Sequence, residues 1–206
     1  MKIRKAIVLT AATLVAMLPL VATSASGTAS RGGCTITGTN GADVLEGTPL
    51  ADVICGLGGN DTIDGKLGND RILGGDGHDT ITGGRGDDVL KGGRGRDRLS
   101  GDEGADRLSG GDGGDPELRG GDGADVVVAG PGNDHAFGGF GADRLVAGEG
   151  DDDLRGAEGD DTLEAVDGVI TNDIVGGGLG TDTCTYDGSP GDWPVADRNN
   201  QCEIFP

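Results

Sequence analysis

Aromatic residues are almost absent from this chain of 206 residues, which contains one Trp, one Tyr and three Phe. The five aromatic residues are Phe137, Phe140, Tyr186, Trp193 and Phe205. So few large apolar side chains are poorly suited to a single compact core. Glycine instead supplies 45 residues, and so much glycine without a period would indicate disorder. The fold class therefore depends on whether the glycines are periodic.

The sequence also lacks the common catalytic motifs. It has no G-x-S-x-G elbow, no P-loop and no HExxH pair. His78 and His135 are its only histidines, and their isolation predicts two surface residues rather than metalloprotease ligands. Carboxylates are too frequent for a neighbouring pair to indicate acid–base catalysis. We therefore expect a protein that is not an enzyme.

Long apolar runs are confined to the first 25 residues, which are typical of a secretory signal peptide. The basic stretch MKIRK precedes an apolar segment at 6–22 and the small residues TSAS. Pro19 and the small-residue exit argue against a membrane anchor, and no later run is long enough to span a bilayer. Cys34 follows RGG rather than a lipidation box. We expect cleavage between Ser24 and Ala29 and a secreted, extracellular protein without stable membrane insertion.

Basic residues are scarce, with 16 Lys and Arg against 36 Asp and Glu. Cleavage after Ala25 would leave 13 basic residues and a charge of about −23. Such a charge repels nucleic acid and anionic lipid and attracts cations. Without counter-ions a glycine-rich acidic chain is expected to stay expanded, because burial does not offset the entropy of ordering.

Only four cysteines occur, at positions 34, 55, 184 and 202. An even number in an exported chain predicts two disulfides, for which three pairings are formally open. Proximity along the chain favours Cys34–Cys55 and Cys184–Cys202. Each would close a loop of about 20 residues and contribute about 3 kcal/mol in the chain-entropy model. A zinc site is disfavoured because no CxxC or paired His is present.

The glycines are periodic. The segment GGDGHDTITGGRGDDVL at 74–90 contains one nine-residue skeleton twice: two glycines, a third glycine, an aspartate and an aliphatic residue. Glycine precedes each aspartate by two positions except at Leu50, and by five except at Ala129 and Ala147. Aspartates recur at this spacing, with one residue inserted near DPEL, at Asp43, Asp52, Asp61, Asp70, Asp79, Asp88, Asp97, Asp106, Asp115, Asp125, Asp134, Asp143, Asp152 and Asp161. Two positions after the aspartate, or three at the insertion, stand Leu45, Ile54, Ile63, Ile72, Ile81, Leu90, Leu99, Leu108, Leu118, Val127, Ala136, Leu145, Leu154 and Leu163.

Each part of this unit has a physical role. Glycine permits positive φ, so a tight turn can direct successive carbonyl groups toward one point. Carbonyl oxygens and a carboxylate together suit a hard cation such as Ca²⁺. The residues after the aspartate predict a short strand whose middle side chain points inward. The alternative, in which the aspartates only form solvated turns, is less favoured.

Over residues 38–164 the repeat resembles the RTX, or haemolysin-type, calcium-binding nonapeptide GGxGxDxUx, where U is aliphatic. The stretch GGGLGTDTC at 176–184 resembles it loosely. The resemblance implies an all-β fold, a right-handed parallel β-roll solenoid with two repeats per coil and about seven coils. The expected domains are a signal peptide (1–25), an N-terminal cap (26–37), the calcium-binding roll (38–164) and a degenerate repeat with a C-terminal cap (165–206).

The resemblance also implies that alternate repeats stack and share calcium between their turns. One row would carry Asp43, Asp61, Asp79, Asp97, Asp115, Asp134 and Asp152, and the other the remaining seven aspartates. Six gaps in each row give at most about twelve Ca²⁺, whose charge of about +24 would nearly balance the exported chain. Pro49 and Leu50 make the Asp52 site doubtful, and Pro116 predicts a bulge and a weakened Asp115 site.

The C-terminal segment loses the period and is expected to cap the roll through Tyr186, Trp193 and the Cys184–Cys202 disulfide.

We expect a stand-alone secreted calcium-binding protein, similar to those of high-GC Gram-positive bacteria, with a structural, adhesive or matrix-binding role. Its partners would be calcium ions and a cell-surface or matrix polysaccharide or protein. A polysaccharide-active enzyme is disfavoured because no upstream domain fits. An ice- or surface-binding protein is disfavoured because the third repeat positions form no ordered Thr/Asn array.

Overall fold

The computed structural model describes residues 33–165, 173–186 and 202–204. The signal peptide predicted at 1–25, most of the N-terminal cap and most of the C-terminal cap, including Trp193, lie outside these residues. Within the described part every regular element is a strand, and no helix is long and apolar enough to cross a membrane.

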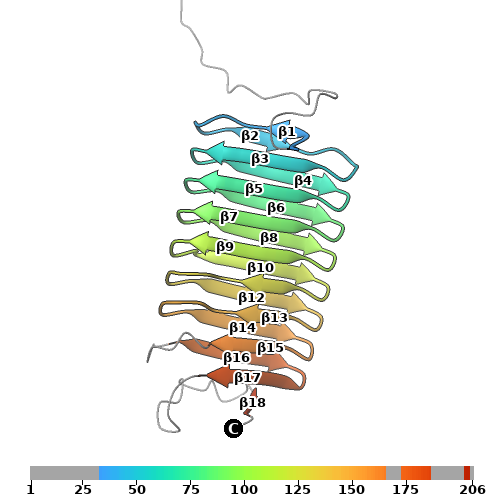
Figure 1. Cartoon of the computed structure of the whole chain (residues 1–206). Helices are drawn as coiled ribbons and strands as arrows, with labels where there is room; N and C mark the ends of the chain where they lie inside the picture. The colour runs from blue at the N-terminus through green and yellow to red at the C-terminus, as the bar shows by residue number, and fades with distance from the viewer. Residues whose placement is uncertain (1–32, 166–172, 187–201, 205–206) are drawn as a thin grey trace, which may run out of the picture.

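The strands form two parallel sheets that face each other along a rod (Figure 1). The ten-stranded sheet consists of β1 (Ile36–Thr37), β3 (Val53–Gly58), β5 (Arg71–Asp76), β7 (Val89–Arg94), β9 (Arg107–Asp112), β11 (Val126–Val128), β13 (Arg144–Val146), β15 (Thr162–Ala165), β17 (Asp182–Tyr186) and β18 (Cys202–Ile204). The eight-stranded sheet consists of β2 (Val44–Glu46), β4 (Thr62–Leu67), β6 (Thr80–Arg85), β8 (Arg98–Glu103), β10 (Glu117–Asp122), β12 (His135–Phe140), β14 (Asp153–Glu158) and β16 (Ile174–Leu179).

From β1 to β17 consecutive strands belong to opposite sheets, so one strand from each sheet makes one coil of two nonapeptides. Equivalent positions stack in register, as Ile54, Ile72 and Leu90 do on β3, β5 and β7. The predicted parallel β-roll is confirmed. It has about eight turns rather than about seven, because β16 and β17 continue the stack beyond the strict repeat.

The core is a double column of aliphatic side chains between the sheets. The residues predicted to point inward are buried, from Leu45 through Leu163, and most are at most 1% exposed. Ala129 and Ala147 replace glycine at a buried position and join the same cluster. The core contains no aromatic side chain among the described residues, so each layer is thin and depends on its neighbours along the rod.

The predicted Cys34–Cys55 disulfide is present, with Cα atoms 6.1 Å apart, and it ties the chain before β1 to β3. Cys184 is also disulfide-bonded. Its predicted pairing with Cys202 stays a prediction, because nothing is described of the Cys202 side chain.

Candidate metal centre

The aspartates of the repeat form two columns along the roll, one at each series of turns. The backbone amide of each aspartate donates to the Oδ1 atom of the aspartate one coil later. Asp79, for example, accepts from Asp61 at 2.8 Å and donates to Asp97 at 2.8 Å. The predicted members are buried from Asp52 to Asp161. This ladder holds every carboxylate at the same place relative to its turn.

Beyond the first turn of each column, the second carboxylate oxygen of these aspartates has no hydrogen-bond partner. Thirteen buried Oδ2 atoms share this state, those of Asp61, Asp70, Asp79, Asp88, Asp97, Asp106, Asp115, Asp125, Asp134, Asp143, Asp152, Asp161 and Asp182. Buried polar atoms in folded proteins are nearly always hydrogen-bonded, and leaving one unsatisfied costs about 1–3 kcal/mol, more for a charged group. An orphaned oxygen repeated at every coil therefore indicates a missing ligand.

The turns bring backbone oxygens close to the same columns: a Cβ added at Gly74 would overlap both the Oδ2 atom of Asp79 and the carbonyl oxygen of Gly92 in the next coil. Gly77 has a φ of 138°, and a Cβ added there would overlap the carbonyl oxygen of Gly59 in the preceding coil. Glycine is thus required at this position for two reasons, a left-handed backbone and the approach of a carbonyl group. Four residues other than glycine also adopt positive φ: Leu57, Lys66, Asp102 and Ala157. Each of them precedes a column aspartate by four positions.

The carboxylates are hard to ionise in this arrangement. Burial raises the pKa of Asp88 to about 6 and the pKa values of Asp106, Asp115 and Asp143 to about 7, while the backbone amide bond to each carboxylate acts in the opposite direction. Repulsion from column neighbours adds to the rise, as Asp88 and Asp125 do for Asp106. A cation placed in the column would remove both penalties.

The chemistry of these donors fits a hard divalent cation. Within the described residues no three His, Cys, Asp or Glu side chains converge on one point. The turns instead offer one carboxylate oxygen per repeat with backbone carbonyl groups beside it. An all-oxygen set that mixes carboxylate and carbonyl ligands is typical of Ca²⁺.

The first turn of each column differs from the others. The Oδ2 atom of Asp43 accepts hydrogen bonds from the amide and the hydroxyl of Thr39, at 2.6 and 2.9 Å. The Oδ2 atom of Asp52 accepts the same two bonds from Thr48, at 2.7 and 2.8 Å. Neither threonine has positive φ. We call these two turns the clamped turns, because a side chain of the turn itself satisfies the oxygen that is orphaned elsewhere.

The insertion at Pro116 leaves the columns intact. The prediction of a bulge within the strand is wrong: β10 pairs with β8 from Glu117 opposite Arg98 without an extra residue, so Pro116 is accommodated before the strand. Asp115 is fully buried, and its Oδ1 atom accepts the amide of Asp97 at 2.8 Å. Its carboxylate therefore lies as the others do.

Two further aspartates continue the columns, and the repeat count missed them. Asp173 accepts the amide of Asp152 at 2.8 Å, and Asp182 accepts the amide of Asp161 at 3.0 Å. Asp182 is fully buried, with Cys184 at the inward aliphatic position. Both lie 21 residues beyond their partners instead of 18. The signal was the stretch GGGLGTDTC, where Cys stands in place of the aliphatic residue.

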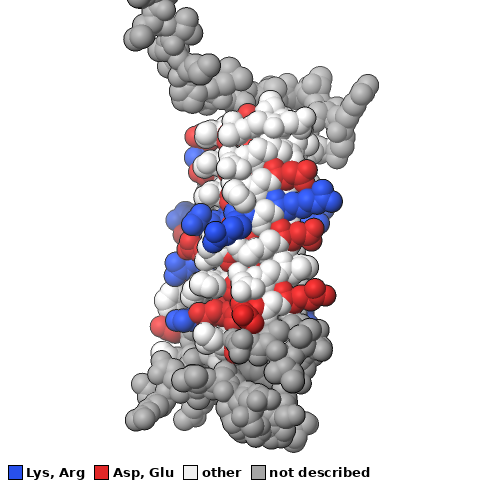
Figure 2. Space-filling view, turned by 90° about the vertical axis from the view of Figure 1, so that its left-hand side faces the viewer, with Lys and Arg blue, Asp and Glu red and all other residues white. Residues whose placement is uncertain are grey.

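The variable repeat positions carry exposed charges outside the columns. Arg94 lies within 3.9 Å of carboxylate oxygens of Asp76 and Asp112, and Arg85 lies 3.1 Å from Glu103. Figure 2 shows basic side chains gathered half-way along the roll, with acidic side chains above and below. Arg71 and Arg107 are separated by Val89 in the register of the ten-stranded sheet. Charges are thus interspersed rather than arranged as a continuous basic stripe.

The isolated histidines are surface residues, as expected from their spacing. His135 is exposed at the start of β12. The His78 Nδ1 atom accepts the backbone amide of Arg96 at 2.8 Å, so this ring links two turns.

A parallel β-roll that stacks one buried carboxylate per nine residues defines a class of metal-dependent repeat protein. The sequence matches the RTX calcium-binding nonapeptide repeat (four copies) over residues 37–72, 56–90, 82–115, 117–136 and 128–163. The chain belongs to this family, and its repeats are calcium-binding repeats. No protein of curated function matches the chain.

Proposed function

We propose that this calcium-binding protein is exported, folds outside the cell when calcium enters the turns, and then serves a structural or adhesive role. One observation carries the proposal: thirteen buried carboxylate oxygens lack a partner, and twelve of them lie within the residues that match the calcium-binding repeat. No comparable number of orphaned oxygens is expected in a fold that is complete by itself.

The proposed ligands are the column aspartates with the turn carbonyl groups beside them. Each ion would be shared by two successive turns of a column. With Asp173 and Asp182 included, each column has eight members and seven gaps. The gaps next to the clamped turns and the gap between Asp152 and Asp173 offer one orphaned carboxylate oxygen instead of two. Leaving out those three gaps gives a proposed capacity of about eleven ions.

Calcium binding and folding would be one process in this chain. In the metal-free roll, buried like charges succeed one another at the spacing of neighbouring strands, about 4.8 Å, and this repulsion opposes folding. A divalent ion bound only by the folded state supplies its binding free energy to folding. Extracellular calcium modules commonly bind calcium at about 10⁻⁴–10⁻³ M. A chain that needs this much calcium to fold would stay unfolded before export.

A calcium titration of residues 26–206 tests the proposal. We expect circular dichroism to change cooperatively from disordered to β-rich, small-angle scattering to change from an expanded coil to a rod, and calorimetry to count about eleven ions. Magnesium is the control, because it demands a smaller octahedral site and should not induce folding at equal concentration. A chain that is fully folded in chelator, or that binds no calcium at millimolar concentration, would contradict the proposal.

A further inference from the structure

Two of the five aromatic residues of the chain lie on one strand at the surface. Phe137 and Phe140 belong to β12, and their side chains lie outside the aliphatic core. Phe140 is 57% exposed, and Phe137 is half-buried. The core of this protein uses no aromatic side chain among the described residues. The exposed phenyl ring of Phe140 therefore adds nothing to the packing of the core. Exposed aromatic side chains beside charged groups are common at binding surfaces.

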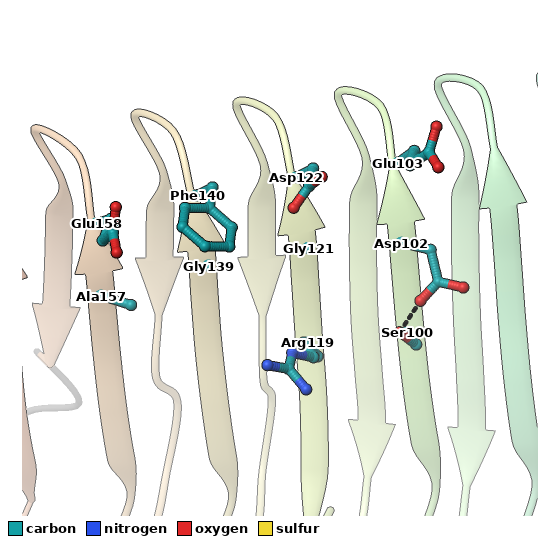
Figure 3. A pocket seen from close by; sticks show the side chains of 10 residues that line it. All are labelled: Ser100, Asp102, Glu103, Arg119, Gly121, Asp122, Gly139, Phe140, Ala157 and Glu158. Atoms are coloured by element: carbon teal, nitrogen blue, oxygen red, sulfur yellow. Dashed lines mark hydrogen bonds between the residues drawn. The ribbon is translucent and has the colours of Figure 1, made fainter.

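The surface beside Phe140 is hollowed. A shallow depression of about 450 Å³ crosses β8, β10, β12 and β14, and Gly121 and Gly139 form its floor because they carry no side chain. Figure 3 shows Phe140 on its rim near the turn ends of the strands, with Arg119 lower on β10. We call this depression the Phe140 hollow.

Carboxylates flank the ring on both sides. Strand register places Asp122 next to Phe140 on β10 and Glu158 next to it on β14. Both carboxylates are exposed. Glu103 follows in the same line but is engaged by Arg85 at 3.1 Å. The side chains of Asp122, Phe140 and Glu158 therefore form a line across three strands that faces solvent, with a carboxylate on each side of the phenyl ring.

The row of side chains next to the hollow, on the side of Arg119, is less acidic, and its Arg155 is already paired. Arg119 lies beside Phe137 in the register. Arg155 lies 6.0 Å from the Phe137 ring centroid and bonds to Asp153 at 2.9 Å. The lining of the hollow contains four carboxylates, those of Asp102, Glu103, Asp122 and Glu158, against the single guanidinium of Arg119.

We propose that the Phe140 hollow binds a Lys or Arg side chain on an extended segment of a partner protein. The cation would lie over the Phe140 ring and between the carboxylates of Asp122 and Glu158, which combines cation–π attraction with charge-assisted hydrogen bonds. The excess of carboxylates repels an anionic polysaccharide, and a neutral glycan would leave the charges unused. This inference names a partner for the adhesive role proposed above, and it uses none of the column carboxylates.

Fluorescence anisotropy with a labelled peptide of alternating Lys and Gly tests the proposal in the calcium-loaded protein at low salt. Phe140→Ala should weaken binding about three- to five-fold. Adding Asp122→Asn and Glu158→Gln should bring the loss to about ten-fold or more, because two exposed charge pairs are lost as well. Phe140→Trp should bind more tightly than wild type. Leu67→Ala is the matched control, because Leu67 occupies the same position of the β4 repeat and is 42% exposed.

Equal binding by wild type and Phe140→Ala would overturn the proposal, as would tighter binding of a peptide of alternating Glu and Gly. Binding of a neutral oligosaccharide without the cationic peptide would assign the hollow to a glycan instead. Binding of no probe would also reject the proposal. Calcium stoichiometry is measured for every variant: peptide binding lost at normal stoichiometry concerns only the Phe140 hollow, whereas abnormal stoichiometry in wild type concerns the proposed function.

Discussion

The aspartate of the repeat has different hydrogen-bond partners in the clamped turns and in the turns that follow them. In the clamped turns, Thr39 and Thr48 satisfy the Oδ2 atoms of Asp43 and Asp52. In the later turns the residue at the threonine position has positive φ, for example Gly93, and the Oδ2 atom of Asp97 is left without a partner. The protein alone can thus satisfy the carboxylate, but in most turns of this chain it does not.

The N-terminal end has further bonds that need no metal. Thr35 donates its hydroxyl to Asp52 Oδ1 at 3.1 Å, and the Cys34–Cys55 disulfide closes the first coil. We therefore expect the start of the roll to form without calcium and to act as a template. Parallel strands gain hydrogen bonds only when a neighbouring strand is already in place, so such a template favours growth of the stack from this end.

The largest effect is expected on removal of calcium. With a chelator present, hydrogen exchange measured by mass spectrometry should become fast across 79–161 and stay slower across 34–55, because only the first segment has satisfied column carboxylates, those of Asp43 and Asp52. Adding a reductant to open Cys34–Cys55 is the control and should make the first segment exchange rapidly too. Uniform exchange of both segments in chelator alone would contradict the comparison.

A matched pair of substitutions within one column sharpens the comparison. Asp106→Asn keeps an acceptor for the amide of Asp88 but removes a buried charge at an orphaned oxygen. We expect the loss of at least one bound calcium and a rise of about two- to ten-fold in the calcium concentration at the folding midpoint, because calcium affinity depends on ligand charge. Asp52→Asn should change neither quantity measurably. Calorimetry gives the stoichiometry, and equal losses in the two variants would show that the clamped turns bind metal as the others do.

The position of the columns could be predicted from the sequence, but their boundaries could not. A period of nine fixes which residues point inward, so the core and the two rows followed from counting. Asp173 and Asp182 were missed because the spacing to the preceding coil grows to 21 residues there, and a strict count ends at such an insertion. Pro116 was expected to distort a strand, since sequence alone does not say whether an extra residue enters a strand or the turn before it.

The clamped turns had a signal that was overlooked. Residues 38–43 and 47–52 read GTNGAD and GTPLAD, and no later repeat has Thr after its first glycine. The doubt about Asp52 rested on Pro49 and Leu50, whereas the structural difference comes from Thr48. Asp43, with a regular glycine pattern, shares this difference. A threonine that replaces the second glycine of the repeat marks a turn closed by its own side chain.

The metal-free roll should respond to pH in the opposite sense from the calcium-loaded one. The pKa values of Asp106, Asp115 and Asp143 are about 7 in the folded chain, against 3.8 as the ordinary value. The folded state therefore binds more protons, so its stability is greatest below about pH 4 and is lost as the pH rises toward 7. In chelator, circular dichroism should show more β-structure at pH 5 than at pH 8.

With calcium present the folding midpoint should shift to higher calcium concentration as the pH falls below about 7, because protons compete for the carboxylates. A metal-free signal that is unchanged between pH 5 and 8 would contradict this expectation.

The smallest effect is expected from breaking one clamp. Thr48→Val removes the hydroxyl bond to Asp52 Oδ2 and the bond that the hydroxyl accepts from the Leu50 amide, but it keeps the Thr48 amide bond and the shape of the side chain. The loss of these two hydrogen bonds should cost about 1–2 kcal/mol, seen in chelator as faster exchange of residues 47–55 and in calcium as a lower urea midpoint. Thr82→Val is the control, because the Thr82 side chain lies in β6, away from any column carboxylate. Calcium stoichiometry should stay at the wild-type value in both variants, or rise by one in Thr48→Val if the released oxygen becomes a ligand. A loss of several ions from Thr48→Val alone would show that the clamps build the calcium sites rather than replace them.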